Sequence, residues 1–95
     1  MSRLSVVLPA YNEEQILAKT CRTLKEILSF SEKEYELVFV DDGSSDKTWN
    51  VIEKVSKEDR NISGIHFSRN FGKEAAIFAG LAQASGDAVA VMDCD

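Results

Sequence analysis

The chain has 95 residues, enough for one small domain, and its composition of 44% apolar and 28% charged residues is typical of a folded globular protein. The formal net charge of −5 argues against a general nucleic-acid binder, because such proteins need clustered lysine and arginine to hold phosphate backbones. Two cysteines in different settings argue against a disulfide framework, and no apolar run approaches the roughly 20 residues that span a bilayer.

Short apolar runs alternate along the chain with segments of helical periodicity. In chain order, the expected elements are a strand over Leu4–Leu8, a helix with its apolar face between Ile16 and Leu28, a strand over Leu37–Val40, a helix over Thr48–Asp59, a strand over Ile62–Phe67, a helix over Gly72–Ala84 and a strand over Ala88–Met92. Asn12 is the expected N-cap of the first helix, and Ser45 or Asp46 that of the second.

This β-α-β-α-β-α-β order predicts an α/β fold of the Rossmann-like kind, with a parallel sheet covered by helices on both faces. The right-handed crossover rule favours the strand order 3-2-1-4. In that order the chain reverses direction between the first and fourth strands, and ligands bind outside the carboxyl ends of strands at such a point. Because the chain stops at Asp95, directly after an apolar run, we expect residues 1–95 to be the N-terminal part of a larger catalytic domain.

Acidic residues follow three of the predicted strands, within 9–14, 41–45 and 93–95. Two like charges about 4 Å apart repel by roughly 4 kcal/mol at an effective dielectric constant near 20, so clustered carboxylates need a cation or raised pKa values. Asp93 and Asp95 point the same way in an extended segment, and Mg²⁺ or Mn²⁺ suits such oxygen ligands. This spacing alone is a weak signal, since acidic residues after strands are usually solvated.

The other strand ends offer groups for a nucleotide. One aspartate of the Asp41-Asp42 pair suffices to close a turn in which Gly43 supplies a positive φ, which leaves the second to accept a hydrogen bond from a nucleobase. Tyr11 offers an aromatic face, and Glu13 a carboxylate, toward the same crevice, although a rigid exit from the strand explains this segment equally well.

The loop before the third helix is basic. Arg69 and Lys73 flank Gly72 and could meet phosphate oxygens near a helix N-terminus, and two solvated basic residues beside a loop glycine are an equally good interpretation. The single histidine, His66, is interpreted as structural. Cys94 is interpreted as a small residue between two aspartates rather than a nucleophile, because no histidine follows to activate it.

Three stretches taken together, Val6 to Glu14, Val40 to Asp46 and Asp93 to Asp95, resemble the start of family-2 glycosyltransferases of the GT-A fold. The resemblance covers essentially the whole chain. Ser68 to Ala76, followed by Gly80-Leu81 and Gly86-Asp87, resembles the branch that transfers sugars to polyprenyl phosphates. That branch includes dolichol-phosphate mannose synthases and bactoprenol glucosyltransferases. The family commonly has alanine where this chain has Cys94.

The resemblance implies a D-x-D site that binds a donor nucleotide and a metal ion, Mg²⁺ or Mn²⁺. The residues that it assigns to donor binding are Pro9, Tyr11, Glu13, Val40, Asp42, Asp93, Cys94 and Asp95, with Asp93 and Asp95 as the metal-binding and catalytic pair. The predicted donor site also includes Ala10, beside Pro9 and Tyr11, and the two basic residues Arg69 and Lys73. It further implies inverting transfer of a hexose from a UDP- or GDP-sugar to a polyprenyl phosphate, with no nucleic-acid partner. The full-length protein is expected at the cytoplasmic face of the inner membrane, which it would contact through C-terminal segments beyond this chain, and a homo-oligomer stays open.

Other functions compete with this one. A saccharide acceptor and a nucleotide-binding relative without turnover both remain open. A receiver-like module would also place acidic residues and Mg²⁺ after parallel strands, but it needs a lysine after a fifth strand, and none is seen. A dinucleotide dehydrogenase is disfavoured because no G-x-G-x-x-G follows the first strand.

Overall fold

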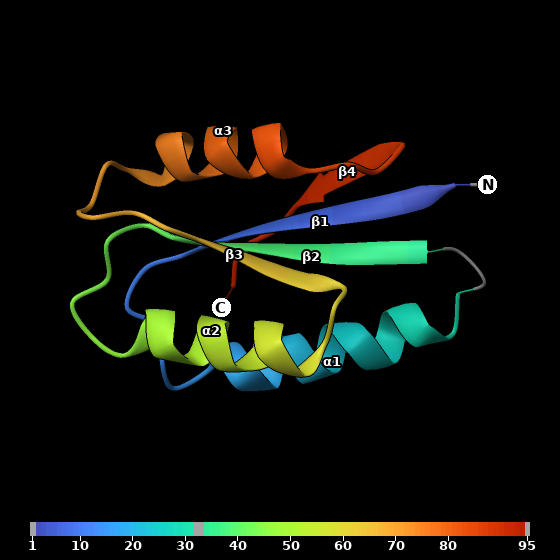
Figure 1. Cartoon of the computed structure of the whole chain (residues 1–95), viewed down its shortest axis with the longest axis horizontal. Helices are drawn as coiled ribbons and strands as arrows, with labels where there is room; N and C mark the ends of the chain where they lie inside the picture. Colours follow the sequence, from blue (N-terminus) through green and yellow to red (C-terminus); the bar gives the residue numbers. More distant parts are fainter. Residues whose placement is uncertain (1, 32–33, 95) are drawn as a thin grey trace.

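The computed structural model describes residues 2–31 and 34–94 (Figure 1). In chain order, its elements are β1 (Arg3–Ala10), α1 (Leu17–Ser29), β2 (Glu34–Asp41), α2 (Thr48–Glu58), β3 (Ile62–His66), α3 (Lys73–Gln83) and β4 (Ala88–Val91). Over these residues no helix is both long and apolar enough to cross a membrane.

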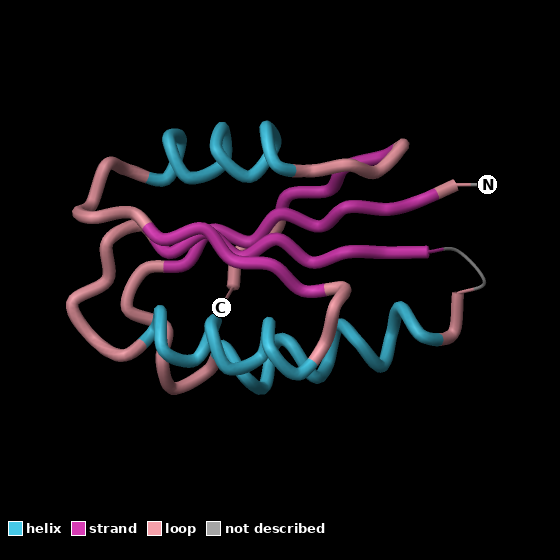
Figure 2. The backbone as a smooth tube through the Cα atoms, in the orientation of Figure 1, coloured by secondary structure: helices cyan, strands magenta, loops and turns pink. Residues whose placement is uncertain are grey.

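The four strands form one parallel sheet in the order β3-β2-β1-β4. Helices α1 and α2 cover one face of this sheet and α3 covers the other (Figure 2). The predicted fold class and the predicted strand order are both confirmed.

The strands at the centre of the sheet bury side chains on both faces. Val6 and Leu8 of β1 pack with Leu17 toward α1 and α2, whereas Val7 packs with Val40 toward α3. These side chains are at most 3% exposed. Burial of each large apolar side chain contributes about 1.5–3 kcal/mol, so the ends of β1 and β2 are firmly anchored to both layers.

Pro9 explains why the pairing of β1 with β4 stops at Val7, whereas its pairing with β2 continues to Ala10. Met92 donates its N–H to the carbonyl of Val7 at 3.0 Å, and the next bond of a parallel ladder would come from the N–H of residue 9. Proline has no N–H, so the ladder ends there. The chain after Met92 is thus released from the sheet and turns across the ends of the strands.

The predicted N-cap of the first helix is wrong. Helix α1 begins at Leu17 after Ile16, without a side-chain cap, whereas Asn12 has a φ of 54°. The Asn12 amide oxygen accepts hydrogen bonds from the N–H groups of Ser45 and Asp46 instead, at 2.9 and 3.3 Å. A contact between two loops therefore outweighs the local capping preference.

The start of α2 agrees better with the predicted N-cap, Ser45 or Asp46. Lys47 occupies the N-cap position, but Oδ1 of Asp46 accepts the N–H of Thr48 at 2.9 Å. Asp46 thus satisfies the first N–H of the helix, as an acidic cap would. Ser45 makes no such contact with the helix, because its N–H and hydroxyl both donate to Asn12.

Candidate functional site

A pocket of about 250 Å³ opens at the carboxyl edge of the sheet. Its walls come from the ends of β1 and β2, the start of α3 and the segment after β4, and the lining residues are Pro9, Ala10, Tyr11, Glu13, Asp42, Lys73, Asp93 and Cys94. The topology therefore brings together most of the residues that the sequence assigned to donor binding.

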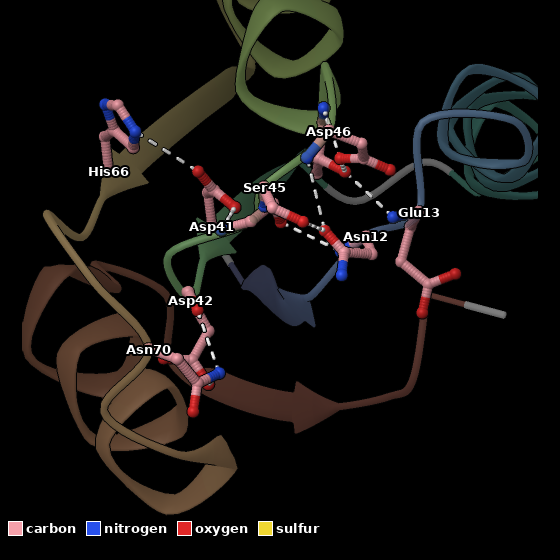
Figure 3. Close-up of polar contacts among 10 residues, drawn as sticks. Asn12, Glu13, Asp41, Asp42, Ser45, Asp46, His66 and Asn70 are labelled. Atoms are coloured by element: carbon pink, nitrogen blue, oxygen red, sulfur yellow. Dashed lines mark hydrogen bonds and ion pairs between the residues drawn. The ribbon is translucent and has the colours of Figure 1, made fainter.

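The loops after β1 and β2 are joined by side-chain hydrogen bonds (Figure 3). Besides the two bonds to Asn12 described above, Glu13 donates its N–H to Thr48 Oγ1 at 2.8 Å and Asn12 donates its N–H to Ser44 Oγ at 2.9 Å. In Figure 3 the Glu13 side chain points away from this cluster. The β2–α2 loop thus fixes the backbone that presents Tyr11 and Glu13 to the pocket.

Asp46 joins the loop after β1 to the start of α2 through an ionised carboxylate. Desolvation acts to raise the pKa of its carboxyl group, but hydrogen bonds from the hydroxyl and N–H of Thr48 and from the N–H of Glu14 outweigh it. The pKa of Asp46 therefore lies below its usual range. A negative charge here also suits the N-terminus of α2.

Asp42 ties the end of β2 to the start of α3. Its side chain is 4% exposed, and its carboxylate accepts the N–H groups of Phe71 at 2.9 Å and Gly72 at 3.2 Å. Asn70 donates its side-chain amide to both the carboxylate and the carbonyl of Asp42, at 3.1 and 3.0 Å. Asp42 thus lines the pocket while its carboxylate holds the loop before α3, an engagement that the sequence did not predict.

Asp41 closes the turn after β2, as expected of one member of the pair. Its Oδ1 accepts the N–H of Ser44 at 3.0 Å, and its fully buried Oδ2 lies 3.3 Å from Nε2 of His66. The His66 ring stacks on Trp49 with the ring centroids 4.5 Å apart. His66 therefore contacts the aspartate that supports the site rather than the pocket itself.

The segment after β4 is held by one residue of α3 and one residue of α1. Nζ of Lys73 lies 2.5 Å from Oδ1 of Asp93. Cys94 is 2% exposed, and its carbonyl accepts the hydroxyl of Thr20 at 2.7 Å. Asp95 lies outside the described residues, so its predicted metal, nucleotide and catalytic roles stay predictions.

Two of the assigned residues do not line the pocket. The Val40 side chain is fully buried beneath α3. Only main-chain atoms of Val40 could therefore contact a nucleotide. The guanidinium of Arg69 lies 4.9 Å from the centre of the Phe71 ring, an arrangement typical of a cation–π pair. Of the two basic residues predicted to meet phosphate, only Lys73 lines the pocket.

Across residues 2–31 and 34–94, no group of three histidine, cysteine or acidic side chains is arranged to hold a metal ion. The exposed carboxylate of Asp93 is nevertheless a hard oxygen donor that already faces a cation, Lys73. A protein site with few ligands fits Mg²⁺ or Mn²⁺, which keep waters and take further oxygens from a diphosphate. The residues present are compatible with such an ion.

Thr20 contacts a residue of the site, Cys94, and the sequence did not single it out, although a hydroxyl within the apolar stripe of a helix is a readable signal. Thr20→Val keeps the shape of the side chain and removes the hydrogen bond to Cys94, which should cost about 1 kcal/mol. The fraction of molecules in which residues 93–94 are detached from α1 should then rise about fivefold. The rate of Cys94 labelling by a thiol reagent, measured in a Cys21→Ala background, should rise accordingly. Thr23→Val, an exposed change on the same helix, is the matched control. An unchanged rate would show that Thr20 does not hold the segment.

The sequence and the fold were compared with known proteins. The model of the family "Glycosyl transferase family 2" matches residues 5–95. The bactoprenol glucosyl transferase of Shigella phage SfV is 42% identical over 93 residues, which are 98% of this chain and 30% of that protein. The chain thus spans about a third of the length of such a relative.

Solved structures share the fold. S. aureus TarS 1-349 in complex with UDP has a TM-score of 0.84 at 31% identity, over 98% of this chain and 27% of that one. The mannosyltransferase PcManGT from Pyrobaculum calidifontis, in complex with GDP-Man and Mn²⁺, has a TM-score of 0.87 at 24% identity, over 99% and 28% of the two chains. The family match spans the strand ends that form the pocket, and this chain belongs to glycosyl transferase family 2.

Proposed function

We propose that the natural protein transfers a hexose, with inversion, from a UDP- or GDP-sugar to a polyprenyl phosphate, and that the chain forms its donor-binding part. The observation that carries this proposal is the pocket, in which residues from the ends of β1, β2 and β4 lie together. The bactoprenol relative supports the acceptor class, and the UDP complex of TarS supports the donor class.

The lining residues divide naturally between the two parts of a nucleotide sugar. Tyr11, which is 48% exposed, offers its ring to a base or ribose, and Glu13 offers a carboxylate to hydroxyl or N–H donors. Asp42 positions the loop that forms the opposite wall. Tyr11 and Glu13 recognise the nucleotide, and neither takes part in bond breaking.

We assign the diphosphate to Lys73 and Asp93, two lining residues whose side chains form an ion pair. Lys73 supplies a positive charge to phosphate oxygens, while Asp93 and Asp95 would hold Mg²⁺ or Mn²⁺. When bound, that ion supplies charge neutralisation of the leaving nucleoside diphosphate. Stabilisation of developing negative charge is the main rate effect that we assign to this part of the protein.

A lipid acceptor requires the protein to work at a membrane surface, and we place the reaction on the cytoplasmic side. The acceptor site and any general base are proposed to lie in the part of the protein that corresponds to the remaining length of the relatives.

The binding of UDP and GDP to the full natural chain, titrated with and without Mn²⁺, tests the donor site. We expect Mn²⁺ to tighten nucleotide binding and Asp95→Ala to reduce that effect by at least about fivefold, a typical coupling between two ligands. Asp87→Ala, an equal charge change at the residue directly before β4, is the control. A nucleotide affinity that changes neither on addition of Mn²⁺ nor in the Asp95→Ala variant would contradict the proposal.

The acceptor is tested separately with radiolabelled UDP- and GDP-hexoses. Incorporation of label into undecaprenyl phosphate, with the opposite anomeric configuration to the donor, is the expected outcome. Transfer only to an oligosaccharide would replace the lipid acceptor by a saccharide. Nucleotide binding without transfer to either acceptor would identify a non-catalytic relative.

A further inference from the structure

An ion pair joins two of the residues that line the pocket. Lys73 begins α3 and Asp93 follows β4, and Nζ and Oδ1 of the two side chains lie 2.5 Å apart. The side chains are 60% and 58% exposed. Exposed pairs of this kind contribute little to stability, because water screens the charges and two long side chains must be ordered. The pair is therefore easily opened.

The position of Lys73 is not explained by the stability of α3. The N-terminus of a helix carries partial positive charge and favours anions, so a lysine at the first helical residue is electrostatically unfavourable. The carboxylate of Asp42 already fills the favourable role there by accepting the N–H groups of Phe71 and Gly72. Lys73 instead forms an ion pair with Asp93, on the segment that is predicted to hold the metal.

We infer that Lys73 is an exchangeable cation that occupies Asp93 until the donor binds. This inference rests on the proposed function. A divalent cation arriving at Asp93 displaces the ammonium group, and the flexible four-carbon stem of lysine lets that group turn to the diphosphate oxygens. Lys73 thus opposes binding of the metal alone and favours binding of the metal together with the nucleotide.

This exchange has a thermodynamic signature. A residue that weakens binding of the metal alone and strengthens binding of the nucleotide increases the coupling between these two ligands. Each ligand then raises the affinity for the other by the same factor. Metal without nucleotide is then held weakly, and the nucleotide recruits the metal. A purely structural lysine would not change the two affinities in opposite directions.

The test is Lys73→Gln in the full natural chain, with Mn²⁺ binding measured by electron paramagnetic resonance and UDP and GDP binding measured by calorimetry. We expect Mn²⁺ alone to bind more tightly than in the wild type, and the nucleotide in saturating Mn²⁺ to bind at least about fivefold more weakly. Lys73→Arg keeps the charge and should restore most of both affinities. Lys57→Gln removes the same charge from the last turn of α2 and should change neither.

An unchanged or weaker affinity of Lys73→Gln for Mn²⁺ alone would overturn the exchange, whatever happens to the nucleotide. Failure of the proposed function looks different. In that case the wild type would bind neither UDP nor GDP in the presence of Mn²⁺, while the competition between Lys73 and Mn²⁺ would still be measurable.

Discussion

Gly43→Ala is expected to lower the free energy of unfolding by roughly 3–5 kcal/mol. Gly43 has a φ of 71°, and an added Cβ would lie 2.1 Å from the carbonyl carbon and 2.5 Å from the carbonyl oxygen of Arg69 and 2.3 Å from the N atom of Asn70. These are backbone atoms that cannot rotate away. The β2 turn and the loop before α3 would have to separate, which also removes the donors that surround Asp42.

Gly72→Ala separates the steric effect from the backbone effect. Gly72 also has a positive φ, of 107°, but an added Cβ would meet no atom within 4 Å. Only the conformational cost applies, about 1–2 kcal/mol. Urea unfolding of the two variants in the full natural chain gives the comparison. Equal losses would show that the close approach of the two loops contributes nothing to stability.

Asp42→Ala is expected to cost roughly 2–4 kcal/mol, because the N–H groups of Phe71 and Gly72 and the amide of Asn70 lose their acceptor. Nucleotide affinity should fall as well, since the wall of the pocket is released. Unfolding in urea and calorimetric titration with UDP and GDP measure the two effects separately.

Asp42→Asn is the matched variant for this position. Its side-chain oxygen still accepts hydrogen bonds, but its NH₂ group faces the donors, so a smaller loss of about 1–2 kcal/mol is expected. A variant Asp42→Ala as stable as the wild type would contradict the assignment of Asp42 to the loop. Unchanged stability of Asp42→Ala with lost nucleotide binding would instead make Asp42 a direct ligand of the base.

The sheet was predictable because its physical signals are local. Runs such as Leu37–Val40 lack polar alternation, which only strands buried on both faces tolerate, and the handedness of crossovers then restricts the order of the strands. The convergence of Pro9, Tyr11, Asp42 and Asp93 on one pocket follows from that order.

Partner choice among polar side chains was not predictable, because it depends on distances between loops. Asn12 was expected to cap its own helix and instead binds the turn after β2. Asp42 was expected to be available to a base and instead accepts the N–H groups of a loop about 30 residues away. Arg69 carries the same charge as Lys73, and only its packing on Phe71 separates their roles.

The most direct test of the account is to locate a bound Mn²⁺–nucleotide complex by paramagnetic broadening of backbone amide resonances in the full natural chain. We predict that UDP or GDP with Mn²⁺ broadens the amides of Tyr11, Glu13, Asp93 and Cys94. The amides of Lys54 and Val55 in the groove between α1 and α2 should be broadened much less. Broadening centred on that groove, or none at either place, would contradict a donor site at the ends of the strands.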